Sequence, residues 1–290
     1  MIRQGAAMLD SPSVWLPANL AEAWELKQRL GLNACFVAGG TLLQTQWQKG
    51  FECPRHLISL EKINEMRGCE KNNHNGEAST RIGALTTLAA CKDDPSLLKN
   101  IPLIEEAIRT IAAPAVRNRA TIGGNIAGGF GDLIPALIAL DASLSLYDGG
   151  KTEIKSLSDC IGQSGGTILT AIYVPENRIL GQKRYFYKKL GFREAFTPSI
   201  VTISGCCKLN SQNEVEYIRL VAGGGTTPYQ RLSCCEKLVE GLTLSNELLT
   251  TLFQAIREEF HTTTDPFTTA DYKKTVAANM IVSKIASFAG

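Results

Sequence analysis

Histidine and closely spaced cysteine pairs, which are common metal ligands, are scarce in this chain. Its 290 residues contain three histidines, and none of the nine cysteines forms a Cys-x-x-Cys pair. The adjacent pairs Cys206-Cys207 and Cys234-Cys235 lack the spacing of a zinc or iron–sulfur site. No side chain has the pattern of a general base or a nucleophile. We therefore expect no catalytic residue and no metal site in this chain.

An excess of one charge and long hydrophobic runs are also missing. The 30 basic and 28 acidic residues leave a net charge of +2 without a basic block, so we expect no nucleic-acid partner. The longest apolar runs, such as residues 133–140, are too short to span a bilayer, and the first residues lack the apolar core of a secretion signal. We expect a soluble cytoplasmic protein with no membrane span, whose cysteines are reduced and mostly buried.

The two standard phosphate-binding motifs are absent as well. Gly129-Phe130-Gly131 lacks the later glycine of a Rossmann fingerprint. The run from Gly124 to Gly129 has P-loop spacing, but Phe130-Gly131 follows where Lys-Ser or Lys-Thr is required. The chain therefore encodes neither a Rossmann nor a P-loop nucleotide site.

What the chain does contain is two glycine-rich loops, at residues 37–43 and 121–126. Each follows an apolar stretch and joins paired glycines to a small polar side chain. Glycine permits a positive φ and a close approach to a ligand, and successive backbone N–H groups form a nest for an anion. A single Gly-Gly pair is most often only a turn, as we expect for Gly223-Gly224-Gly225. Two such loops suggest a ligand with a diphosphate, held from two sides.

The segments around the loops make this pattern more specific. Their order resembles the FAD-binding subunit of the molybdenum hydroxylases, the family of xanthine dehydrogenase and aerobic carbon monoxide dehydrogenase, over nearly the whole chain. The matching segments are Trp15-Leu16-Pro17, Arg81 to Thr87, Ile111 to Ala120, Asp132 to Ala142, Tyr187 to Ala195 and Asp271-Tyr272-Lys273.

The resemblance implies an α+β fold in two domains. Residues 1–177 would form a two-lobed flavin-binding domain of the vanillyl-alcohol-oxidase or p-cresol-methylhydroxylase type. Residues 183–290 would form a C-terminal α+β domain with a small antiparallel sheet and helices. The residue pattern agrees, because alternating short strands and helices give way to long strands followed by helices. These later elements are expected as strands over 199–209 and 214–221 and helices over 236–241, 245–259 and 270–286.

The resemblance also implies one non-covalently bound FAD. The first loop would supply backbone donors and a hydroxyl for the diphosphate, and the second loop would form the opposite wall. Ala112 lies near where the family packs against the adenine or the flavin, and Leu169 fits a position that packs against the flavin. The full candidate set is Val37, Ala38, Gly39, Gly40, Thr41, Leu42, Leu43, Ala112, Thr121, Gly123, Gly124, Asn125, Asp132, Leu169 and Lys189.

Asp132 has two readings at this point. Its carboxylate can accept bonds from a ribityl or ribose hydroxyl, or it can cap the helix that begins near Leu133. The chain carries Gly131-Asp132 where family members usually carry Ser-Asp, and the preceding loop is shorter.

Lys189 also has two readings. It matches the lysine that the family places by the flavin, where a cation favours the anionic reduced ring. The alternative is a solvated lysine among Lys183, Arg184 and Lys188. The family register, with Arg193 following, favours the flavin. Thr197 replaces the family's aspartate, so any role of that carboxylate is lost.

The function implied by the resemblance is electron transfer within a molybdenum-dependent hydroxylase. An iron–sulfur subunit and a molybdopterin subunit would be the partners, and NAD⁺ or another molecule would accept the electrons. Many relatives carry Asp or Asn after the Thr, and the Leu42-Leu43 pair in that place resembles members of purine catabolism, which favours xanthine dehydrogenase. The alternatives are a hydroxylase subunit for carbon monoxide, nicotinate or an aldehyde, a self-sufficient flavin oxidase or reductase, and a non-catalytic nucleotide-binding module.

Overall fold

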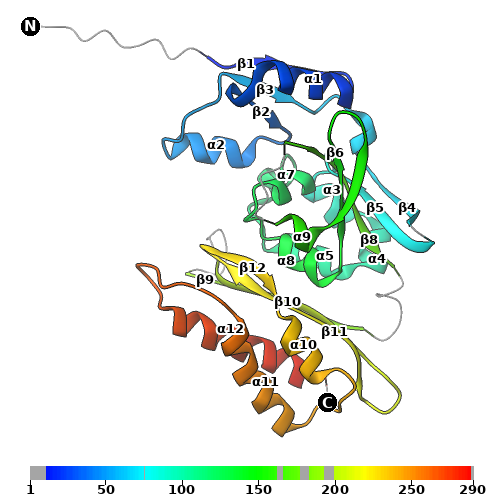
Figure 1. The fold of residues 1–290 in the computed structure, drawn as a ribbon, viewed down its shortest axis with the longest axis vertical. Helices are drawn as coiled ribbons and strands as arrows, with labels where there is room; N and C mark the ends of the chain where they lie inside the picture. Colours follow the sequence, from blue (N-terminus) through cyan, green and yellow to red (C-terminus); the bar gives the residue numbers. More distant parts are fainter. Residues whose placement is uncertain (1–10, 75, 162–165, 177–182, 193–198, 289–290) are drawn as a thin grey trace, which may run out of the picture.

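Three sheets, stacked along the longest axis of the molecule, organise the chain (Figure 1). This computed structural model describes residues 11–74, 76–161, 166–176, 183–192 and 199–288. The positions of Arg193 and Thr197, both named above, lie outside the described residues.

The first lobe is built on a three-stranded parallel sheet in the order β1-β3-β2. The Asn19 side chain accepts a hydrogen bond from the Glu22 N–H and so begins α1, which buries Ala23 against Ile58 in a small core. Strand β2 leads directly into the first glycine loop, and α2 follows that loop. The elements are β1 (Ser13–Trp15), α1 (Leu20–Leu30), β2 (Ala34–Val37), α2 (Thr41–Gln48) and β3 (His56–Ser59).

The second lobe is built on a five-stranded antiparallel sheet in the order β4-β5-β8-β6-β7. Strands β4 and β5 pair as an antiparallel hairpin. The strands are β4 (Cys69–His74), β5 (Glu77–Gly83), β6 (Ser143–Tyr147), β7 (Thr152–Ser156) and β8 (Ile168–Pro175). The helices are α3 (Leu88–Asp93), α4 (Pro95–Asn100), α5 (Pro102–Arg109), α6 (Pro114–Arg117), α7 (Ile122–Ala127), α8 (Ile134–Ala139) and α9 (Leu157–Cys160).

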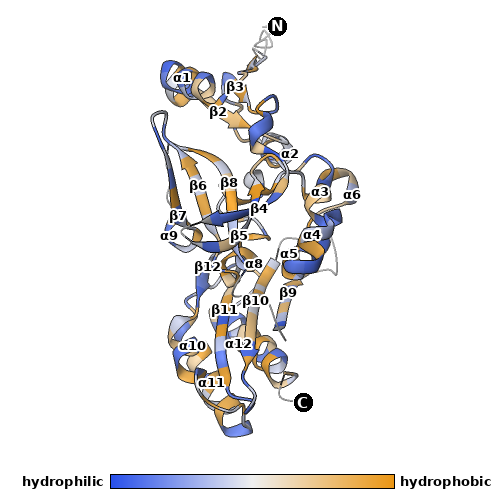
Figure 2. Ribbon diagram, turned by 90° about the vertical axis from the view of Figure 1, so that its right-hand side faces the viewer, coloured by the Kyte–Doolittle hydropathy of each residue, from blue (hydrophilic) through white to orange (hydrophobic). Residues whose placement is uncertain are grey.

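The third sheet is antiparallel, in the order β12-β11-β10-β9. Figure 1 shows helices α10, α11 and α12 on the face that points away from the second lobe. In Figure 2 these helices combine hydrophobic and hydrophilic segments, as expected for helices that cover a sheet. The elements are β9 (Lys183–Gly191), β10 (Ser199–Leu209), β11 (Val215–Gly224), β12 (Thr227–Arg231), α10 (Ser233–Val239), α11 (Asn246–Glu259) and α12 (Ala270–Ala286).

Both faces of this third sheet are covered, so most residues of β10 are buried, including the polar Thr202 and Ser204. Ile203 and Phe186 pack into the core beneath the helices. On the opposite face, Tyr187 joins the core of the second lobe, and the Cys206 thiol donates to the Ala139 carbonyl at 3.1 Å. Alternation along β9 and β10 therefore decides which side chains reach the second lobe.

An ion cluster at the end of α8 fastens the second lobe to the third sheet. Asp141 accepts from Arg219 Nε at 3.0 Å, from Arg231 Nη1 at 3.1 Å and from the Tyr217 hydroxyl at 3.0 Å. Glu236 accepts from Arg231 Nη2 at 2.7 Å. Because these three donors come from the third sheet, they hold the end of α8 on that sheet.

Candidate cofactor-binding site

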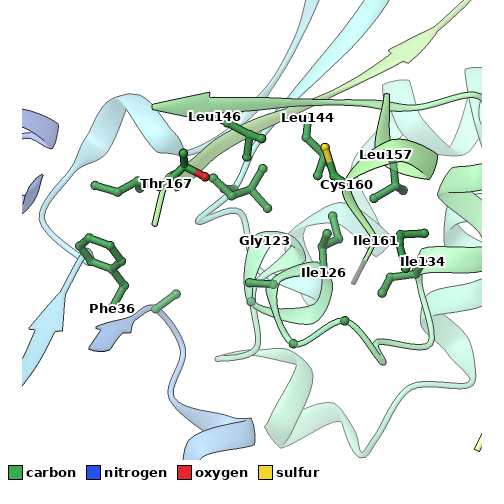
Figure 3. A pocket seen from close by; sticks show the side chains of 18 of the residues that line it. Phe36, Gly123, Ile126, Ile134, Leu144, Leu146, Leu157, Cys160, Ile161 and Thr167 are labelled. Carbon is green, nitrogen blue, oxygen red and sulfur yellow. The ribbon is translucent and has the colours of Figure 1, made fainter. Parts of the chain in front are cut away.

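Two adjoining cavities border helix α7. The first, which we call the loop cavity, has a volume of about 570 Å³ and is lined by both glycine loops. The second, the apolar cavity, has a volume of about 740 Å³ (Figure 3). Each has the size of a typical small-molecule site. The lining residues common to both are Phe36, Ala38, Gly124, Ala127, Gly128 and Phe130.

The first glycine loop presents unpaired N–H groups to the loop cavity. Gly40 has φ 71°, a left-handed conformation, and stands at the N-cap of α2 without a capping side chain. Among the acceptors that the structure describes, none pairs with the N–H of Gly40, Thr41 or Leu42. These donors lie at the positive end of the helix dipole, so they fit the diphosphate expected from the sequence.

Gly39 serves a different purpose, because it brings the two loops into contact. A Cβ atom on Gly39 would lie 2.0 Å from the Arg119 carbonyl oxygen, on the segment that leads to the second loop. A Cβ on Gly40 would meet only Val37 Cγ1, at 3.8 Å. The first glycine is therefore required for backbone packing, and the second for its positive φ.

The second glycine loop uses its N–H groups within the protein. Gly123 N–H donates to the Ala84 carbonyl at 2.9 Å, and Gly124 N–H donates to Thr121 Oγ1 at 3.1 Å. Both glycines lie in α7, where we had expected a second nest of free donors. A Cβ on Gly123 would lie 2.6 Å from Ala84 Cβ, so this glycine also permits close packing. The groups of this loop that can still donate into the cavity are the Thr121 hydroxyl and the Asn125 side-chain amide.

Ala112 forms a strained part of the loop-cavity wall. Its φ is 44°, which is uncommon for a residue with a Cβ. The Arg117 guanidinium donates to the carbonyl of Ala112 and, at 2.8 Å, to that of Ile111. This pair of bonds stabilises the turned backbone, a type of local strain that often marks a binding site.

The structure rules out one of the two readings of Asp132, the helix cap. Helix α8 begins at Ile134 without a side-chain cap, so Asp132 is not its N-cap. The Asp132 carboxylate lines the loop cavity and accepts from Lys189 Nζ at 2.6 Å. The two side chains are 22% and 12% exposed, which makes this a half-buried ion pair between the second lobe and the third sheet.

Leu169 lies in the apolar cavity, whose walls come mainly from β6, β8, α7, α8 and α9. Figure 3 shows Leu144, Leu146, Ile126 and Cys160 around this space. Burial raises the pKa of the Cys160 thiol above its ordinary value, so the thiol is protonated and a poor nucleophile at neutral pH.

Two candidates lie outside the cavity linings. Val37 belongs to β2, and its carbonyl accepts from Leu60 N–H at 2.9 Å. Lys189 reaches the loop cavity only through Asp132. Phe36, which the sequence argument missed, lines both cavities together with Ala38, and the alternation of β2 carries that signal. The other residues of the loop cavity that were not among our candidates are Gln46, Leu88, Ile111, Val116, Ala120, Ala127, Gly128, Phe130 and Gly131.

Other kinds of site find no support in the described part of the chain. No cluster of histidine, cysteine, aspartate and glutamate there could hold a metal ion. No helix there has the length and apolarity needed to cross a membrane. All nine cysteines are free; four are buried, which corrects our expectation that most would be, and Cys53 and Cys234 are exposed.

Comparisons with known proteins agree with this geometry. Residues 9–177 match the FAD binding domain in molybdopterin dehydrogenase, and residues 186–287 match the CO dehydrogenase flavoprotein C-terminal domain. The carbon monoxide dehydrogenase medium chain of Hydrogenophaga pseudoflava is 39% identical over 132 residues, which are 45% of each chain. A putative xanthine dehydrogenase FAD-binding subunit of Escherichia coli is 25% identical over 87% of each chain.

The solved structures extend the likeness to the whole fold. Carbon monoxide dehydrogenase from Hydrogenophaga pseudoflava, in a form that lacks the Mo-pyranopterin moiety of its cofactor, contains a similar chain with a TM-score of 0.87 and 25% identity. The match covers 96% of the present chain and 98% of that one.

Proposed function

The chain belongs to the family of FAD-binding domains in molybdopterin dehydrogenases, and from this premise we propose that it is the electron-transfer subunit of a molybdenum-dependent hydroxylase. The observation that carries the proposal is the row of unpaired N–H groups from Gly40 to Leu42 beside a cavity that continues into an apolar one. A ligand that joins an anionic group to an aromatic ring system would fit this pair of cavities, because the N–H groups suit the anion and the apolar walls suit the ring.

We place the two ends of FAD by the chemistry of the cavity walls. The start of α2 would hold the diphosphate. We propose that the apolar cavity would take the adenine, so Leu169 would contact the adenine and not the flavin ring that the resemblance implied. The isoalloxazine ring would lie in the loop cavity between Ala112 and Asp132, whose carboxylate is paired with Lys189. Phe130 and Leu42, which are 67% and 50% exposed, lie at this cavity, so a ring there would be close to the surface.

When bound, FAD supplies the redox chemistry, accepting electrons from an iron–sulfur subunit and passing them to NAD⁺ or another acceptor. The contribution of the chain is to bind and tune this group. Lys189 places a cation, and Asp132 an anion, beside the proposed ring position. The protein thereby controls the charge that the reduced ring experiences.

The proposal includes finer points. We place the domain boundary between residues 177 and 183, between the two family matches, and assign the first domain to the vanillyl-alcohol-oxidase type. We propose a cytoplasmic complex with an iron–sulfur subunit and a molybdopterin subunit, supported by the nine free thiols. Xanthine remains our proposed substrate from the Leu42-Leu43 pair, although a carbon monoxide dehydrogenase chain has higher identity over its shorter match.

We expect FAD to be bound without a covalent link. The loop cavity has no histidine or cysteine among its lining residues, and the Cys160 thiol of the apolar cavity is held protonated by burial. Acid precipitation should release all the flavin into the supernatant. A pellet that keeps its yellow colour would contradict this prediction.

We expect the FAD-loaded chain alone to oxidise no purine. Hydroxylation requires a metal-activated oxygen, and the described residues offer no group of metal ligands. Co-expression with candidate iron–sulfur and molybdopterin subunits should instead yield a complex on size-exclusion chromatography that oxidises its substrate. Molybdenum-free purine oxidation by the single chain would favour a self-sufficient flavoenzyme.

A further inference from the structure

Tyr187 is a buried tyrosine whose hydroxyl crosses from the third sheet to the second lobe. It is 2% exposed, and its hydroxyl donates to the Asp132 backbone carbonyl at 2.7 Å. The acceptor belongs to the residue whose carboxylate lines the loop cavity and pairs with Lys189. One residue of the second lobe is thus held by two side chains of β9.

The geometry of β9 explains why these two side chains act together. Tyr187 and Lys189 are two positions apart, so they project from the same face of the strand. The pairing with β10 is regular here, with Tyr187 opposite Ser204 and Lys189 opposite Thr202. Both partners on β10 are fully buried, which leaves the two β9 side chains in a rigid frame.

We propose that Tyr187 is a positioning residue, which fixes the backbone of Asp132 so that the carboxylate meets Lys189 at the loop cavity. The inference rests on the proposed FAD site and deepens it. An ion pair of this kind contributes only when its geometry is good, and the Tyr187 bond supplies that geometry without touching either charge. Loss of the hydrogen bond between Tyr187 and the Asp132 carbonyl loosens the ion pair, so the Asp132 carboxylate neutralises less of the Lys189 charge.

A second tyrosine supports this arrangement. Burial, and then the nearby Asp132 charge, raise the pKa of Tyr229 above its ordinary value, so its hydroxyl stays neutral beside the carboxylate. Gly223 allows this placement, because a Cβ there would lie 2.6 Å from Tyr229 Cδ1. Gly223 therefore packs β11 closely against Tyr229, and the turn that we expected in this segment follows at Gly225, between β11 and β12.

The test compares Tyr187→Phe with Tyr217→Phe in the full chain loaded with FAD. Tyr217 is the matched control, since its hydroxyl also crosses to the second lobe, where Asp141 Oδ2 accepts it at 3.0 Å. A freed Lys189 stabilises the negative charge of the reduced ring. Tyr187→Phe should therefore shift the two-electron flavin equilibrium towards reduction by about threefold to tenfold, the effect of one hydrogen bond. Tyr217→Phe should leave it unchanged.

A measurement without FAD separates this inference from the proposed function. The coupling between Asp132→Asn and Lys189→Met is measured by a double-mutant cycle of unfolding free energies. The cycle is repeated in the wild-type, Tyr187→Phe and Tyr217→Phe backgrounds. The coupling should shrink in Tyr187→Phe and persist in Tyr217→Phe. Equal coupling in the wild-type and the Tyr187→Phe backgrounds would overturn the inference, even for a chain that binds FAD. A chain that binds no FAD, but loses coupling in Tyr187→Phe, would overturn the proposed function alone.

Discussion

Gly39→Ala is expected to reduce FAD affinity by about a hundredfold or more, and Gly40→Ala by only about tenfold. The added methyl of Gly39→Ala would lie 2.0 Å from the Arg119 carbonyl oxygen. Neither the Cβ atom nor the carbonyl can rotate away, because both are fixed by the backbone, so the two loops must separate. Overpacking of this kind costs up to roughly 3 kcal/mol. The methyl of Gly40→Ala has room and adds only the ~1–2 kcal/mol of a left-handed alanine.

Two further glycines give the matched controls, and fluorescence titration of the apoprotein with FAD gives the affinities. Gly50 has φ 89° and open space where the methyl of an alanine would lie. Gly50→Ala therefore introduces the same backbone strain as Gly40→Ala, but at a residue that lines neither cavity. A Cβ at Gly205 would lie 2.7 Å from the Arg219 carbonyl, so Gly205→Ala repeats the overlap inside the third sheet. Both should lower thermal stability and retain FAD affinity. Undiminished affinity in Gly39→Ala would mean that the loops do not bind the cofactor.

The second large effect concerns the half-buried pair of Asp132 and Lys189, whose removal should shift the flavin potential in opposite directions. Lys189→Met removes a cation that stabilises the reduced ring, so the potential falls. Asp132→Asn removes the neutralising anion and exposes the Lys189 charge, so the potential rises. Each change should be about tenfold in the redox equilibrium, which is ~30 mV for a two-electron couple.

Dye equilibration of the FAD-loaded variants measures these potentials. Lys188 is exposed on the other face of β9, so Lys188→Met is the control and should have no effect. The double variant Asp132→Asn/Lys189→Met should return towards the wild-type potential. A shifted flavin potential in Lys188→Met, together with an unchanged potential in Lys189→Met, would mean that Lys188 and not Lys189 faces the flavin from β9.

The sequence predicted the elements whose signals are local. Helix α12 has the expected bounds, 270–286, because its apolar spacing and the Thr269 cap are visible in the sequence. Strand β10 likewise has the expected bounds, 199–209. Strands β7 and β12 were missed, since short strands with mixed polarity carry little periodic signal.

The candidate site shows the same limit. Both glycine loops were located from composition, but the separate purposes of their glycines depend on distant segments, the Arg119 carbonyl for Gly39 and Ala84 for Gly123. The pairing of Asp132 with Lys189 joins residues 57 positions apart in the chain, across two lobes. Tyr187 begins one of the segments that match the family, but no role could be predicted for it, because its importance comes from the acceptor that its hydroxyl reaches.

The central claim is that this chain is a flavoprotein whose FAD lies between the two glycine loops. The most direct measurement is the absorbance spectrum of the purified full chain after incubation with FAD and gel filtration, beside Gly39→Ala and Gly205→Ala. We predict a flavin spectrum with one FAD per chain for wild type and Gly205→Ala, and none for Gly39→Ala. Wild-type protein without flavin absorbance, or Gly39→Ala with a full complement of FAD, would contradict the account.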